Sequence, residues 1–130
     1  MDFNSLLIGS EDPDRLVEYY KKVFGEPTMS MGGYTGWQVG SGFVTVGPHS
    51  EVKGKNDAPG RIIWNIETKD VAGEFARIKA AGGIVVAEPY GYQGEERVEP
   101  SEQVSADIAT FADPDGNYFQ LMSPMDPSQM

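Results

Sequence analysis

The chain has 130 residues, no cysteine and a formal net charge of −10, so we expect a single domain, residues 1–130, without disulfides, thiolate metal sites or cysteine nucleophiles. Its acidic surface repels phosphate backbones and anionic lipid head groups, which argues against a nucleic-acid or membrane partner. No signal peptide or bilayer-spanning run stands out, and we expect the protein to lie in the cytoplasm.

The first part of the chain indicates a strand, a helix and then three short strands. Residues 2–10 suit a buried strand, because apolar residues occupy both of its faces. A helix follows, with Asp12 as N-cap, Pro13 at its first position and Gly25 as its stop. Residues 28–46 are punctuated by glycine and predict three short antiparallel strands.

The second part begins after a polar stretch, residues 48–59, with the composition of a linker. Residues 61–68 predict a strand. A helix follows, with Asp70 as its candidate N-cap and Gly82 near its stop. Residues 84–87 predict another strand.

Residues 88–104 are too polar for a core element and too long for an ordinary hairpin loop. They predict either a mobile flap or a disordered insertion. Tyr90 and Tyr92 give the segment apolar mass that could close over a cavity, which keeps the flap open as an alternative.

Residues 110–122 contain the sharpest turn signal of the chain. Pro114 presets φ at one corner and Gly116 supplies a positive φ at another, so two flanking apolar runs are predicted to pair as strands. In the second run Gln120 shares a face with Tyr118 and Met122. Gln120 is therefore a candidate functional residue.

The two halves repeat the same order of elements: strand, helix with an Asp N-cap and a glycine stop, then short strands. We divide the chain into module 1, about 2–47, a linker, about 48–59, module 2, about 60–123, and a C-terminal tail, 124–130. Such a repeat predicts an α+β fold of two βαβββ modules. Their strands would form a curled, eight-stranded mixed sheet, or cup, with both helices on its outer face.

Three segments carry a family resemblance: DPDRLVEYYKKVFG, DVAGEFARIKAAGGIVV and FADPDGNYFQLM. Together with the repeat they resemble the vicinal oxygen chelate superfamily, which includes glyoxalase I, extradiol dioxygenases and bleomycin-resistance proteins. The resemblance covers essentially the whole chain and implies the fold just described. It does not select a function, because this scaffold carries lyases, dioxygenases, isomerases and binding proteins.

The resemblance also implies four metal-ligand positions facing the cup, which hold His, Glu or Gln in metal-dependent members. In this chain the four positions fall on Ser5, Thr45, Ile63 and Gln120. Two hydroxyls, a hydrocarbon and a neutral amide form a weak set for a divalent cation, so we expect no metal and no other cofactor. An unusual site using Gln120 and Glu67 is the alternative, and the one histidine, His49, is expected to be a solvated loop residue.

Strand alternation predicts a pocket of apolar and neutral polar side chains inside the cup. The candidate ligand-binding residues are Ser5, Leu7, Trp37, Thr45, Ile63, Asn65, Tyr118, Gln120 and Met122. The opposite face is expected to pack under the helices through Leu6, Ile8, Trp64, Ile66, Phe119 and Leu121.

Two functions remain open. The first is binding of a small aromatic or cationic molecule in the cup, as the bleomycin-resistance branch implies. The second is a metal-independent, or unusual-metal, lyase, isomerase or dioxygenase-type enzyme, with Glu67 as general base and Tyr118 or Gln120 polarising a carbonyl. In either case we expect a homodimer, because the edges of an open sheet leave unpaired backbone groups.

Overall fold

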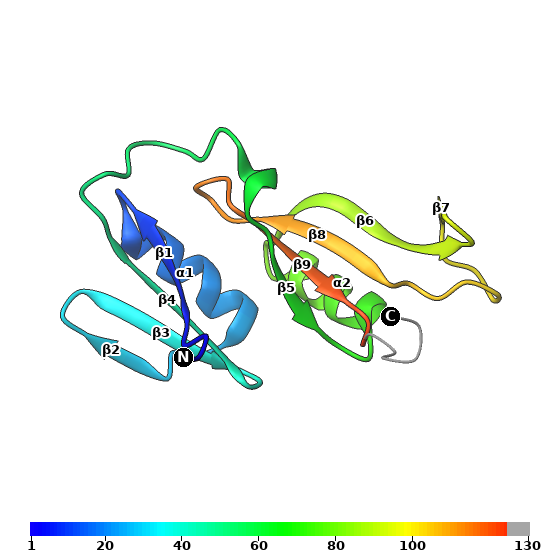
Figure 1. Ribbon diagram of the computed structural model, residues 1–130, viewed down its shortest axis with the longest axis horizontal. Coiled ribbons are helices and arrows are strands. Elements are labelled where there is room, and N and C mark those ends of the chain that lie inside the picture. Colours follow the sequence, from blue (N-terminus) through cyan, green and yellow to red (C-terminus); the bar gives the residue numbers. More distant parts are fainter. Residues whose placement is uncertain (125–130) are drawn as a thin grey trace.

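The structure is a computed structural model that describes residues 1–124. The N-terminal module contains β1 (Leu6–Ser10), α1 (Pro13–Phe24), β2 (Met29–Met31), β3 (Tyr34–Val39) and β4 (Gly42–Pro48), and the C-terminal module contains η1 (Pro59–Arg61), β5 (Trp64–Glu67), α2 (Val71–Ala80), β6 (Ile84–Gln93), β7 (Glu96–Val98), β8 (Ile108–Ala112) and β9 (Tyr118–Met122). Figure 1 shows the two modules side by side, joined by the connector that follows β4. The predicted tail, 124–130, lies outside the described residues apart from Pro124.

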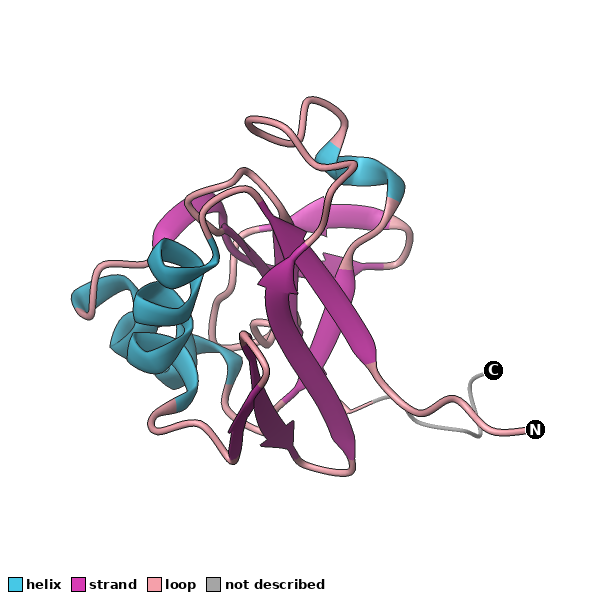
Figure 2. Ribbon diagram, turned by 90° about the vertical axis from the view of Figure 1, so that its left-hand side faces the viewer, coloured by secondary structure: helices cyan, strands magenta, loops and turns pink. Residues whose placement is uncertain are grey.

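Each module builds its own sheet. The strand order is β1-β4-β3-β2 in the N-terminal sheet and β5-β9-β8-β6-β7 in the C-terminal sheet. In both, the first and last strands of the module pair in parallel, and the remaining pairs are antiparallel. Both helices lie on the same side of the strands (Figure 2). This arrangement confirms the α+β fold of two modules with outer helices.

Two details of the sheets differ from the sequence prediction. The sequence predicts eight strands in one sheet, whereas residues 1–124 form nine strands in two sheets. The two sheets are separate: β1 and β5, the terminal strands that would pair in a single sheet, share no backbone ladder within the described residues. The ninth strand, β7, comes from the segment predicted as a flap or a disordered insertion.

Residues 88–98 of that segment form a hairpin arm, and residues 99–104 form no strand. β6 continues to Gln93, the chain turns at Gly94 with φ +67°, and β7 returns antiparallel to β6. The Arg97 guanidinium lies over the Tyr90 ring, 3.7 Å from its centroid, which fixes the two strands to each other. The arm lies at the opposite edge of the sheet from β5 and does not cover the space between the modules (Figure 1).

The two helices begin in different ways. Asp70 caps α2 as predicted, because its Oδ1 accepts a hydrogen bond from Gly73 N–H at 2.9 Å. Asp12 precedes α1 but makes no side-chain cap; its own N–H donates to Ser10 Oγ at 3.0 Å. Neither α1 nor α2 has the length and apolar character that a bilayer-crossing helix needs.

The hydrophobic core runs through both modules. The predicted alternation is observed: the buried or half-buried residues on the helix side include Leu6, Ile8, Trp64, Ile66, Phe119 and Leu121. Tyr20 of α1 lies at the centre of this core. Its ring centroid is 6.2 Å from that of Trp37 in its own module and 6.1 and 6.0 Å from those of Trp64 and Phe119 in the other. Aromatic packing therefore joins the modules.

The turn between β8 and β9 makes a second connection through the buried carboxylate of Asp113, which is 1% exposed. Its Oδ1 accepts hydrogen bonds from the backbone N–H groups of Asp115 and Asn117 at 2.9 and 3.0 Å. Its Oδ2 accepts from the Tyr20 hydroxyl at 2.7 Å. Burial raises the pKa of Asp113, and the hydrogen bonds from Asn117 and Tyr20 oppose that rise.

Asp115 in the same turn binds the start of the N-terminal module. Its carboxylate accepts a hydrogen bond from Ser10 Oγ and forms an ion pair with the Arg15 guanidinium, both at 2.6 Å. The carboxylate is almost fully buried, so the ion pair is screened less than a surface pair. One turn of the C-terminal module thus holds both β1 and α1.

We predict that Tyr20→Phe destabilises the protein by about 1.5–3 kcal/mol near neutral pH, because it removes a hydrogen bond to a buried carboxylate. The pKa of Asp113 then rises further above its unfolded value. When an acid has a higher pKa in the folded protein than in the unfolded chain, its charged form destabilises the folded protein. This destabilisation is absent at pH values below the unfolded pKa and complete at pH values above the folded pKa. The loss should therefore shrink as pH falls through the raised pKa, as measured by urea unfolding at several pH values.

Tyr19→Phe is the matched control for this measurement. Its hydroxyl donates to the backbone oxygen of Ala112 at 2.8 Å and not to a carboxylate, so its loss should depend little on acidic pH. An equal loss for Tyr20→Phe at neutral and acidic pH would contradict the role given to Asp113.

Candidate functional site

A cavity of about 490 Å³ lies between the two modules, within the size range of small-molecule sites. We call it the intermodule cleft. The residues that line it come from the N-terminal segment, β1, the β3–β4 hairpin and β5: Phe3, Leu6, Val39, Gly40, Ser41, Gly42, Phe43, Val44, Trp64, Asn65, Ile66 and Glu67.

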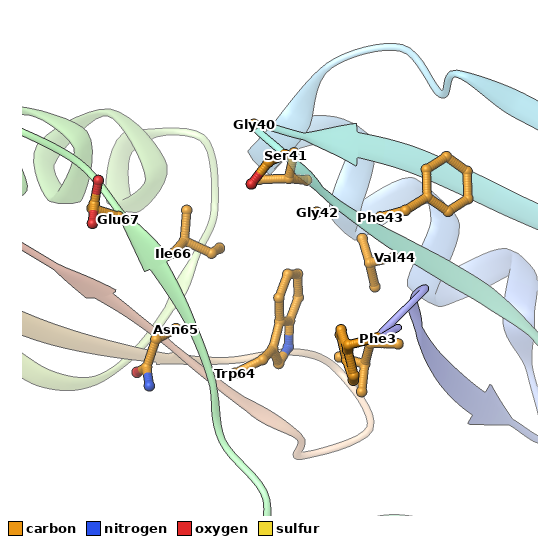
Figure 3. Close-up of a pocket in the computed structure, with 12 residues that line it drawn as sticks. Phe3, Gly40, Ser41, Gly42, Phe43, Val44, Trp64, Asn65, Ile66 and Glu67 are labelled. Carbon is orange, nitrogen blue, oxygen red and sulfur yellow. The ribbon is translucent and has the colours of Figure 1, made fainter. Parts of the chain in front are cut away.

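Most of the side chains that line the cleft are apolar, while backbone groups and three polar side chains also reach it. Figure 3 shows Trp64 and Ile66 on the side of β5 that faces Val44, with Asn65 and Glu67 on the other side of the same strand. This is the alternation that a strand imposes on its side chains. Ser41 lies at the β3–β4 turn, on the opposite wall from Ile66.

The indole of Trp64 forms a rigid part of this wall. Its ring centroid lies 5.7 Å from that of Phe24 and 5.8 Å from that of Phe119, so the core holds it in place. Its Nε1 is the one buried side-chain nitrogen or oxygen within residues 1–124 that has no hydrogen-bond partner. A buried donor without an acceptor is costly, and in a native protein it calls for an explanation.

A glycine positions Phe43 at the rim. A Cβ atom at Gly36 would lie only 2.6 Å from the Phe43 ring, so the ring lies against bare backbone on the neighbouring strand. Any larger residue at Gly36 would displace Phe43. Phe43 and Val44 point to opposite faces of β4, and the cleft touches both.

Charge at the cleft is negative. Glu67 is the single ionisable residue that lines it among those described. A second cavity, about 370 Å³, shares Val39, Gly40, Ile66 and Glu67 with the cleft and also includes Arg77. The Arg77 guanidinium is paired with the Glu74 carboxylate at 2.8 Å, so its charge is largely compensated.

The structure distributes the predicted site residues over three environments. Asn65 and Glu67 line the intermodule cleft. Trp37, expected in a pocket wall, is instead 1% exposed in the core, where its indole N–H donates to Gly25 O at 2.9 Å. The remaining candidates lie outside the cleft lining and are partly or well exposed: Ser5, Leu7, Thr45, Ile63, Tyr118, Gln120 and Met122.

Gln120 belongs to a polar row on the helix-free face of the C-terminal sheet. It is the register partner of Asn65 on one side and of Thr110 on the other. Its Nε2 donates to Thr110 Oγ1 at 3.1 Å. In the other sheet, Thr45 pairs with Leu7 and its hydroxyl donates to Leu6 O at 3.3 Å.

The side chains at the four metal-ligand positions do not fit a divalent cation. Ile63 has no donor atom, and Ser5, Thr45 and Gln120 offer two hydroxyl oxygens and one neutral amide oxygen, with no carboxylate or imidazole among them. Within residues 1–124 no three His, Cys, Asp or Glu side chains are close enough to hold a metal ion. His49 is exposed in the connector, where its Nδ1 accepts from Glu51 N–H at 3.2 Å.

The sequence prediction missed most of the cleft. The alternation of side chains along the strands assigns Leu6 and Trp64 to the core. Both pack against the core and also line the cleft. Phe3, Ser41 and Phe43 carry no signal of their own in the sequence. The signal that could have located them is the repeat, because it makes β1 and β5 the terminal strands of two neighbouring sheets.

A comparison with protein-family models identifies the family of the chain. The family model described as a glyoxalase-like domain matches residues 5–122. A comparison with curated proteins gives no significant match.

Solved structures support the same fold. The chain is similar to a glyoxalase-related enzyme from Fulvimarina pelagi (TM-score 0.68, 16% identity, 98% of this chain and 94% of that one). It is also similar to a glyoxalase/bleomycin resistance protein/dioxygenase family enzyme from Burkholderia phytofirmans (0.67, 19%, 96% and 100%). A third is the fosfomycin resistance protein FosX from Listeria monocytogenes (0.64, 15%, 100% and 98%).

The two tryptophans make a matched pair for a stability test. We predict that Trp64→Phe is tolerated, because it removes an indole N–H that has no acceptor. Trp37→Phe should lower the free energy of unfolding by about 1–3 kcal/mol more, since it leaves Gly25 O without its donor. Chemical denaturation of both variants measures the difference. An equal loss in the two variants would contradict the unpartnered state of the Trp64 indole.

Proposed function

The chain belongs to the glyoxalase-like domain family, and from that membership we propose that it is a small-molecule-binding protein that works without a metal ion. Its ligand lies in the intermodule cleft. The observation that carries the proposal is the form of this cleft: about 490 Å³, walled by Trp64, Ile66, Val44 and Leu6, with few polar side chains. Sites that bind small organic molecules combine a mostly apolar wall with a few groups that fix orientation.

A ligand that combines an apolar or aromatic group with a positive charge suits this site best. A planar ring can lie against Trp64, which the core holds rigidly. A positive group is favoured by Glu67 at the cleft and by the formal net charge of −10, which attracts cations over long range. One structural neighbour is named for fosfomycin resistance and another for a family that includes bleomycin resistance, which supports small-molecule binding on this scaffold.

The enzymatic alternative rests on the polar row beside the cleft. Glu67 and Gln120 lie on the paired strands β5 and β9. The register partner of Glu67 is Met122, two residues after Gln120, and Tyr118 lies at the start of β9. The Gln120 amide donates one of its two N–H groups to Thr110, which leaves a single N–H to polarise a substrate carbonyl. Binding requires only the cleft as it stands, and we therefore prefer it. Turnover that is lost in Glu67→Gln would favour the enzyme.

We also propose that the protein acts as a homodimer. β2 and β7 are the outer strands of the two sheets, and each leaves one edge unpaired. A partner chain that covers such edges removes an aggregation hazard.

The metal-free state is a testable part of the proposal. We predict that the purified protein keeps only substoichiometric nickel, zinc, iron or manganese after dialysis, because its donor set is too weak to hold them. Elemental analysis measures this. One tightly held metal per chain would overturn the metal-free proposal and would move the site to the face that carries Gln120.

We predict that 2-(1-naphthyl)ethylamine raises the melting temperature of the protein. At about 100 times its Kd, a ligand stabilises the folded state by about 2.7 kcal/mol, or roughly 10 °C for a chain of this size. The neutral analogue 2-(1-naphthyl)ethanol should bind more weakly, and the difference should shrink as salt screens the acidic surface. Thermal unfolding at low and high ionic strength measures both effects.

Ser41 supplies the control. Ser41→Phe adds a ring at an exposed position facing the cleft and should abolish the temperature shift, whereas Ser41→Ala should keep it. A shift that survives Ser41→Phe would place the ligand elsewhere.

A further inference from the structure

The intermodule cleft runs along a strand edge and not over a strand face. Its lining includes four consecutive residues, Trp64–Glu67, which are the whole of β5. Successive side chains of a strand point to opposite faces, so a cavity above one face touches alternate residues. A cavity that touches all four follows the edge. The other edge of β5 pairs with β9, so the cleft follows the free edge.

The hydrogen bonding of β5 shows which backbone groups face the cleft. Thr68 N–H donates to Met122 O at 2.9 Å, and Met122 is the register partner of Glu67. In a parallel ladder, alternate residues turn both N–H and C=O toward the neighbouring strand. Asn65 and Glu67 therefore turn these groups away from β9 and into the cleft. No backbone hydrogen bond between elements within residues 1–124 involves them.

We propose that the intermodule cleft binds a short, extended peptide that pairs its backbone with the N–H and C=O groups of Asn65 and Glu67. The inference rests on the proposed small-molecule function and names its ligand class. An unpaired strand edge is a ready template for another extended chain, and main-chain hydrogen bonds supply much of the affinity in that mode.

The shape of the site sets the length of the peptide. β5 has four residues, which span about 13 Å at roughly 3.3 Å per residue. The peptide therefore has three or four residues. β1, on the other wall, is also a terminal strand and contributes Leu6. The cleft thus lies between two sheets that each end in a strand with one free edge.

The two faces of β5 determine which types of side chain the peptide should carry. A strand added to β5 places alternate side chains beside Trp64 and Ile66, which suits apolar residues. Its other side chains lie on the face of Asn65 and Glu67, where a basic residue meets a carboxylate and an acidic protein surface. The expected ligand alternates apolar and basic residues.

The probe is the blocked tetrapeptide acetyl-Val-Lys-Val-Lys-amide, with acetyl-Val-Glu-Val-Glu-amide as its charge control. Calorimetric titration should show binding of the first and little binding of the second. Asn65→Pro removes one cleft-facing N–H, and an edge strand tolerates proline where its N–H is unpaired. Asn65→Pro should weaken binding about 10-fold, the upper range for one hydrogen bond, and Asn65→Ala, which keeps the N–H, should weaken binding less.

A ligand series tests the same point on the unchanged protein, should Asn65→Pro fail to fold. Methylation of one peptide nitrogen at a time blocks one backbone hydrogen bond and leaves the side chains intact. Methylation at alternate positions should weaken binding about 2- to 10-fold, and methylation between them should have little effect. Equal effects at all positions would overturn the edge-pairing proposal.

The remaining outcomes separate this inference from the function on which it rests. If the naphthyl amine binds and no tetrapeptide does, the peptide proposal falls and the small-molecule function stands. If neither binds, both fall. If Asn65→Pro dissociates a dimer seen by sedimentation and peptides do not bind, the edge of β5 pairs with a second copy of the chain and the proposal is overturned.

Discussion

The arrangement of the two modules depends on a single turn, Asp113–Asn117, and on its two buried carboxylates. Asp113 accepts the Tyr20 hydroxyl while Asp115 accepts Ser10 and Arg15, so one turn holds both the first strand and the first helix of the other module. Each carboxylate loses hydration on burial, and hydrogen bonds from several donors replace it. With Tyr20 fixed in this way, the rings of Phe119 and Trp64 pack around it, and the wall of the cleft follows.

The cleft remains because this connection joins the two modules without joining their sheets. The helix sides of the sheets merge into one core, but β1 and β5 do not join into one sheet, so the space along their edges stays open. That space is lined mainly by apolar side chains and by the unpaired edge of β5. In the proposed function, a ligand that covers the apolar side chains and pairs with this edge stabilises the folded protein.

Much of the fold follows from the sequence, because local chemistry and tertiary packing agree there. Pro13 and Gly25 bound α1, Asp70 caps α2, and the positive φ of Gly116 makes the predicted turn. The candidate site could be predicted less well from the sequence. The polarity of the 88–104 segment indicates a loop, whereas the contact of Arg97 with Tyr90, seven residues apart, stabilises a hairpin. The sequences around Trp37 and Trp64 are similar. Only tertiary contacts decide that Trp37 lies in the core and that Trp64 lines the cleft.

The indole N–H resonances of the two tryptophans test the central claim, that the cleft between the modules is the ligand site. Both can be observed in one ¹H–¹⁵N correlation spectrum during titration with the naphthyl amine. Trp37 is hydrogen-bonded inside the core and serves as an internal reference, whereas Trp64 forms the wall of the cleft. A ligand in the cleft should shift the Trp64 signal with saturation and leave the Trp37 signal unchanged. A ligand that binds while the Trp64 signal stays in place would contradict this claim.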